Sequence, residues 1–117
     1  MNTVQLIGNL ATKVELREVG DDKKLGTFVL AVDRPGQDPG ADFVRIATWQ
    51  RQAEVCGQYL TKGKRISVEG RLRSHSWEDP DGKRRSSLEV VASRVEFLSP
   101  REGASPEVMP FEPAAAT

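Results

Sequence analysis

The sequence predicts an all-β fold, a small barrel of five main strands with one short helix. Apolar and polar residues alternate with a period of two through most of residues 1–98. An apolar spacing of three and four residues interrupts this pattern at about 51–61. Segments rich in Gly, Pro and Asp separate the alternating stretches, as turns do. The length of 117 residues suits one domain.

Before the helix we expect three main strands and one shorter segment. Val4 and Leu6 alternate with polar residues in the first strand, where Gly8 indicates a bulge or bend. Residues 34–40 are dense in Pro and Gly and form a loop. The expected strand ranges are 3–10, 13–19, 25–33 and 43–49.

The helix is expected at about 51–61, because Ala53, Cys56 and Leu60 recur at helical spacing, and Gly63 suits its C-terminal stop. Two long strands follow, 65–74 and 86–98, joined by a tight turn at 79–82.

The inward side of the second long strand is expected to carry Leu88, Val90 and Ala92. Val95 and Phe97 have the other parity, so a bulge is expected near Ser93 in between.

This order of three strands, a helix and two strands is that of an OB-fold, a five-stranded Greek-key barrel with its helix between strands 3 and 4. Such barrels bind oligonucleotides or oligosaccharides on one sheet face and its loops. We expect residues 1–99 to form this domain. Residues 100–117 are rich in Pro, Ala and Glu without periodicity, which indicates a flexible tail.

The charge distribution is uneven although the net charge is zero. The 17 basic and 17 acidic residues taken alone argue against a nucleic-acid binder. Residues 62–85, however, hold eight basic residues against four acidic ones, whereas the end of the chain is mildly acidic. The chain therefore has a basic middle that could contact phosphates.

Aromatic and basic residues are expected to share an outward face of neighbouring strands. Period two places Phe43, Arg45 and Trp49 together, opposite the core-facing Val44 and Ile46. Such a face can stack bases and neutralise phosphates, which single-strand binding requires. A lone outward Trp could instead be a partial core or interface residue, and the arginines could form a solvated face. In the next long strand, the residues that share one face are Arg71, Arg73, His75 and Trp77.

The sequence offers no catalytic or metal-binding group, and we expect no enzyme activity and no cofactor. His75 is the only histidine, and Cys56 is the only cysteine, nineteen positions away. A lone cysteine cannot form an internal disulfide, which favours a reducing, cytoplasmic compartment. No apolar stretch is long enough to span a membrane, and the N-terminus does not resemble a signal peptide.

Several segments resemble those of bacterial single-stranded DNA-binding proteins, over residues 1–98 and in the same order. Residues 2–10 resemble the opening strand of that family, and residues 53–64 resemble its helix. Residues 68–73, followed by Trp77 and the Asp81-Gly82 turn, resemble its fourth strand and hairpin.

The resemblance implies a homotetramer of OB-folds with single-stranded DNA wrapped over its outside. It implies no sequence preference and no membrane association. Arg51 and Arg71 are further candidates for contacts with the strand. The positions that match the family's DNA contacts are Phe43, Arg45, Trp49, Tyr59, Lys62, Arg73 and Trp77.

Two segments depart from the family pattern. An aromatic residue is common after the second strand, where this chain has Arg34-Pro35-Gly36. The usual tail ends in aspartates followed by Ile-Pro-Phe, whereas residues 107–112 stop short of the end and residues 113–117 follow. The sequence therefore resembles a short paralogue without the acidic tip, and recruitment of replication and repair proteins through that tip is not supported.

The expected function is sequence-independent binding and protection of single-stranded DNA in replication, recombination or repair, at the nucleoid in the cytoplasm. The alternative is an OB-fold adaptor for other proteins, similar to a primosome component, with incidental nucleic-acid binding. Single-stranded RNA also stays open as a ligand, because stacking and phosphate contacts suit either nucleic acid.

Overall fold

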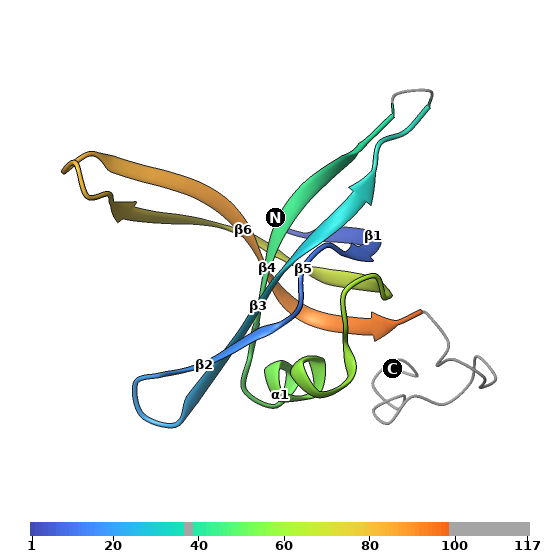
Figure 1. The fold of residues 1–117 in the computed structure, drawn as a ribbon, viewed down its shortest axis with the longest axis horizontal. Coiled ribbons are helices and arrows are strands. Elements are labelled where there is room, and N and C mark those ends of the chain that lie inside the picture. The colour runs from blue at the N-terminus through green and yellow to red at the C-terminus, as the bar shows by residue number, and fades with distance from the viewer. Residues whose placement is uncertain (37–38, 99–117) are drawn as a thin grey trace.

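The computed structural model describes residues 1–36 and 39–98, which form six strands and one helix (Figure 1). The elements follow the expected order, and the expected tail at 100–117 lies outside the described residues, as does residue 99. The elements are β1 (Val4–Leu10), β2 (Glu15–Val19), β3 (Lys23–Asp33), β4 (Ala41–Trp49), α1 (Gln50–Tyr59), β5 (Arg65–Glu78) and β6 (Arg84–Phe97).

Five of the strands close into a ring. The sheet order is β1-β5-β6-β4-β3-β2, and β1 also pairs with β3, so that β2 alone lies outside the ring at the edge of β3. The β4–β6 pairing is parallel, and the others are antiparallel. Helix α1 follows β4 and precedes β5 in the chain, and it packs at one end of the barrel against β3, β4 and β2 (Figure 1). This arrangement confirms the OB-fold.

The core lies inside the ring and is built from one parity of each strand. The buried side chains of β3 to β6 are mostly even-numbered before the bulge in β6, as period two requires. The hydroxyl of Thr48 is fully buried and donates to the carbonyl oxygen of Gly26 at 2.8 Å, so its polar atom is satisfied. The largest fully buried apolar side chains are Leu30, Ile46, Ile66, Val68 and Val90.

The expected bulge in the last strand is confirmed at Ser93. Glu69 pairs with Arg94 and the next residue, Gly70, pairs with Ala92, which leaves Ser93 as the extra residue. The Ser93 hydroxyl donates to the carbonyl oxygen of Glu69 at 2.9 Å. Gly70 has no room for a side chain, since a Cβ there would lie 2.1 Å from the carbonyl oxygen of Val91.

The bulge or bend expected at Gly8 takes another form. Pairing between β1 and β5 continues without a shift through Gly8, so there is no bulge. The next residue, Asn9, pairs with both Arg65 of β5 and Ala31 of β3. A Cβ at Gly8 would lie 2.3 Å from the carbonyl oxygen of Ala31, so the glycine permits the close approach that closes the ring.

Two further expectations were wrong in detail. Helix α1 ends at Tyr59 with Leu60 as an extended cap, and Gly63, with φ of +94°, lies in the following turn instead of stopping the helix. Leu88 is 61% exposed, not inward. Its strand partner is Ser74, and this part of β5 and β6 extends beyond the barrel as an arm (residues 74–88; Figure 1), where no core is left to cover it.

We predict that Gly70→Ala lowers the free energy of unfolding by about 1–3 kcal/mol, because its Cβ meets backbone atoms of β6 that cannot move away independently. Urea denaturation of both variants measures the effect. Gly57→Ala is the control, since its Cβ meets only the flexible end of Leu16 and alanine favours a helix by about 1 kcal/mol. Equal destabilisation by the two substitutions would contradict this account of the bulge.

Candidate nucleic-acid interface

Strand pairing gathers six of the expected site residues on one surface. Arg45 pairs with Val29 of β3, and the parallel β4–β6 register sets Ala47 against Val91. Val91 in turn pairs with Arg71 of β5. Paired residues point to the same side of a sheet, so these odd-numbered positions define an outer face. The expected site residues on this outer face are Phe43, Arg45, Trp49, Arg71, Arg73 and Trp77.

The three aromatic residues of the outer face differ in exposure. Phe43 is 68% exposed near the start of β4, and Trp77 is 43% exposed on the arm. Trp49 is half-buried, because it ends β4, pairs with Leu25 and immediately precedes α1. Phe43 and Trp77 therefore present open ring surface, whereas Trp49 can offer only part of its ring.

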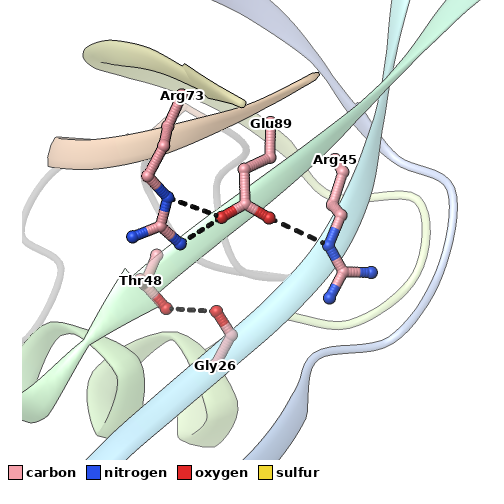
Figure 2. Close-up of polar contacts among 5 residues, drawn as sticks. All are labelled: Gly26, Arg45, Thr48, Arg73 and Glu89. Atoms are coloured by element: carbon pink, nitrogen blue, oxygen red, sulfur yellow. Dashed lines mark hydrogen bonds and ion pairs between the residues drawn. The ribbon is translucent and has the colours of Figure 1, made fainter. Parts of the chain in front are cut away.

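A carboxylate that the sequence analysis did not single out lies at the centre of the outer face. Glu89 of β6 has a side chain that is only 4% exposed. Its Oε1 accepts from Nε of Arg45 at 3.2 Å, and its Oε2 accepts from Nε of Arg73 at 3.1 Å. A second nitrogen of Arg73, Nη2, also donates to Oε2 (Figure 2). One acidic group thus joins β4, β6 and β5.

The two arginines keep Glu89 ionised. Burial alone would raise the pKa of this carboxyl, but hydrogen bonds and charge attraction from Arg73 and Arg45 outweigh it and hold the pKa below its usual range. The acid offsets one of the two positive charges. Glu89, Arg45 and Arg73 together therefore carry a net charge of about +1. Both arginine side chains stay partly exposed to solvent.

The arm is organised at its tip by Asp79. Its carboxylate accepts from the amides of Asp81 at 3.0 Å and Lys83 at 2.9 Å, and from Nε of Arg85 at 2.8 Å. The hydrogen bond from Arg85 is the largest cause that lowers the pKa of Asp79, and the bond from the Lys83 amide is the second. A tight turn was expected here, and the Asp79 side chain that organises it is half-buried. Trp77 is thereby anchored, because it pairs with Arg85 across the arm.

His75 stacks on Trp77, with ring centroids 5.6 Å apart and an interplanar angle of 27°. Both residues lie on the outer face of the arm, as the alternation predicted. One face of Trp77 is thus supported by a ring of the protein, which restricts its rotation and prepares it for stacking.

Three candidates lie elsewhere. Tyr59 is the half-buried last residue of α1, Arg51 is exposed at its start, and Lys62 is exposed in the turn that follows it. They belong to the helical end of the barrel and not to the outer face.

Glu89 could have been found from the sequence by one signal. In the strand expected at 86–98 it has the parity opposite to the core residues Val90 and Ala92, so it shares its face with the outward arginines. Its burial could not have been found this way, because it depends on two strands that flank β6 only in the closed barrel.

Within residues 1–36 and 39–98, no group of three His, Cys, Asp or Glu side chains is placed to hold a metal ion. The thiol of Cys56 is buried, and burial raises its pKa to about 12. In the described part of the chain, no helix is sufficiently long and apolar to cross a membrane.

The fold and the outer face define a class: an OB-fold whose surface combines exposed aromatic rings with arginines. The model of the single-strand binding protein family matches residues 1–98. The chain therefore belongs to the single-strand binding protein family. Its members bind without catalysing a reaction, so the chain is a binding protein and not an enzyme.

Curated relatives agree with this assignment. The chain is 45% identical over 102 residues to a single-stranded DNA-binding protein of Clostridium tetani, covering 84% of the chain and 70% of that relative. It is 39% identical over 108 residues to one of Caldanaerobacter subterraneus subsp. tengcongensis, covering 88% and 71%. A Bacillus cereus protein of the same name is 41% identical over 107 residues, covering 88% of the chain and 63% of that relative.

We predict that Asp79→Ala frees the tip of the arm, because the amides of Asp81 and Lys83 lose their acceptor. Hydrogen exchange at these two amides should be faster, while exchange in the barrel strands should be unchanged. Asp81→Ala removes an exposed carboxylate from the same turn and is the control. Unchanged exchange at both amides in Asp79→Ala would show that Asp79 does not organise the tip.

Proposed function

We propose that this chain binds single-stranded DNA without sequence preference and protects it in replication, recombination or repair. The observation that carries the proposal is the outer face, on which Glu89 fixes two arginines between exposed aromatic rings. The curated relatives of this chain are named single-stranded DNA-binding proteins, which supports this choice of ligand.

The proposed contacts divide into stacking and phosphate binding. Phe43, Trp49 and Trp77 stack bases, at about 1–3 kcal/mol per base, and every base offers a ring face, so no sequence is preferred. Arg45 and Arg73 hold phosphates from the centre of the outer face. Residues proposed to extend the path or add phosphate contacts are Arg71, Tyr59 and Lys62.

We propose residues 1–99 as the binding domain and 100–117 as its flexible tail. A homotetramer is the proposed assembly, with one strand wrapping several barrels. Ile7, Leu72 and Leu88 support self-association, because they are large apolar residues exposed on the single chain. The location we propose is the cytoplasm, at the nucleoid, where single-stranded chromosomal DNA arises and a free Cys56 stays reduced.

One observation favours the alternative of a protein-binding adaptor. A hollow between β2 and α1 is lined by Leu16, Gly57 and the Lys24–Glu54 ion pair, and Leu16 is exposed there. Such a hollow could accept an apolar side chain of another protein, including a replication or repair protein. It lies outside the outer face, so the two functions can be tested separately.

Titration of the intrinsic tryptophan fluorescence with oligo-dT tests the proposed function. Single-stranded DNA should quench the emission, the affinity should fall as salt rises, and duplex DNA should have little effect. An unchanged signal with both ligands would overturn the proposal and leave the adaptor as the better account.

We predict that Trp49→Ala and Trp77→Ala each weaken binding by about 1–3 kcal/mol with little loss of fold, because each removes a stacking ring. Binding of a short dye-labelled oligo-dT, followed by anisotropy, measures this without relying on the removed tryptophan. Ser86→Ala is the control for Trp77→Ala, since both residues are exposed on the arm but lie on opposite faces. Normal affinity in Trp49→Ala would show that Trp49 does not contact the DNA. Loss of self-association in this variant would show that Trp49 lies in the interface between subunits.

A further inference from the structure

We propose that Glu89 is a positioning residue for single-stranded DNA: it fixes the orientation of Arg45 and Arg73 and offsets one of their two charges. The inference rests on the proposed function, because it concerns the same outer face. Its consequence is that binding depends less on salt, and more on preformed geometry, than two free arginines would allow.

The geometry leaves each arginine able to contact a second group. A guanidinium has five N–H donors. Arg45 gives only its Nε to Glu89, and Figure 2 shows its two terminal nitrogens pointing away from the carboxylate. Arg73 gives Nε and Nη2, and its remaining terminal nitrogen also points away. Glu89 therefore holds one side of each guanidinium and leaves another side for a phosphate.

The position of Glu89 explains why both arginines are held at once. Strand β6 runs between β4 and β5, so a residue of β6 can reach both neighbours. Each carboxylate oxygen serves a different arginine. Arg45 and Arg73 therefore have a defined separation before DNA arrives, and less side-chain entropy remains to be lost on binding.

Stability alone does not explain a buried carboxylate here. Replacing buried ion pairs by apolar residues of similar size is often neutral or stabilising, because desolvation offsets the charge attraction. The neighbouring outer-face residues Ala47 and Val91 show that apolar side chains fit between these strands. An acid at position 89 does what they cannot, since it orients two cations.

The test compares Glu89→Gln, Glu89→Asp and Glu54→Gln with the unchanged chain. Glu89→Gln removes the charge and keeps the size, and Glu89→Asp keeps the charge but shortens the reach to the arginines. Glu54→Gln is the matched control, because it removes an equal charge from the exposed Lys24–Glu54 pair outside the outer face. Affinity for a short oligo-dT is measured from about 0.02 M to about 1 M salt, a range in which the screening length falls from tens of ångströms to a few.

Log affinity is plotted against log salt concentration for each variant. The expected result is that the lines for Glu89→Gln and for the unchanged chain cross. One more unbalanced cation steepens the slope of log affinity against log salt by about 0.7 for a single strand, so binding is tighter at low salt. At high salt the loss of orientation dominates, and binding is about three- to tenfold weaker. Glu89→Asp should keep the original slope but show the high-salt loss, and Glu54→Gln should follow the unchanged chain.

Three outcomes would overturn the proposal. A Glu89→Gln line that superimposes on the original shows that Glu89 neither orients nor offsets the arginines. A parallel line displaced downward shows a purely structural role. Glu54→Gln with the same crossing shows a general charge effect. Should Glu89→Gln fail to fold, normal high-salt affinity in Glu89→Asp contradicts the positioning role by itself.

Failure of the proposed function gives a different result. In that case Arg45→Ala and Arg73→Ala bind oligo-dT as the unchanged chain does at every salt concentration. If these two variants lose affinity while the Glu89 variants behave normally, the outer face is the DNA site and only the role of Glu89 is wrong.

Discussion

Closure of the barrel depends on β1 pairing with two strands in succession. Residues Val4 to Asn9 pair with β5, and Asn9 and Leu10 pair with β3. The change of partner requires the backbones to meet at Gly8, where the carbonyl oxygen of Ala31 occupies the space of a side chain. With the ring closed, β2 pairs outside it at the edge of β3, and β6 lies between β4 and β5. The neighbours of β6 on the outer face follow from this order.

The central carboxylate depends on closure, whereas the projecting arm is the continuation of the β5–β6 pairing past the barrel. Glu89 can bridge Arg45 and Arg73 because β6 is flanked by the strands that carry them. The bulge at Ser93 shifts the register of β6 against β5, so that the outward side chains of β6 before the bulge align with Arg71, Arg73 and Trp77. The arm then leaves the barrel, and its tip is fixed by Asp79 and Arg85. A cationic centre held by Glu89 is thus placed on the same face as aromatic rings of β4 and β5.

The sequence predicted the elements that depend on local periodicity. The strand order, the single helix, the bulge near Ser93 and the shared face of Phe43, Arg45 and Trp49 all follow from alternation of two or from helical spacing. Where local pattern and global geometry differ, the prediction was wrong. Leu88 alternates as a core residue but lies past the end of the core. Of the bulge or bend expected at Gly8, the bulge does not form, and the glycine permits a close approach of two backbones.

The candidate site was predicted in its cations and rings but not in its organisation. From the sequence, the outward arginines were interpreted as separate phosphate contacts. A sequence does not show that one acid contacts two of them. The burial of Glu89 and the ordered tip at Asp79 are tertiary properties, which depend on neighbouring strands and on turn hydrogen bonds. The resemblance added Tyr59 and Lys62 to the expected DNA contacts, and the fold places both at the helical end of the barrel.

The central claim is that a single strand lies across the outer face, and ultraviolet cross-linking to oligo-dT followed by mass spectrometry tests it most directly. The account predicts cross-links in peptides that contain Phe43, Trp49 and Trp77, with weaker ones near Tyr59. Cross-links concentrated instead on β1, or on β2 around Leu16, would contradict it and place the DNA on another surface.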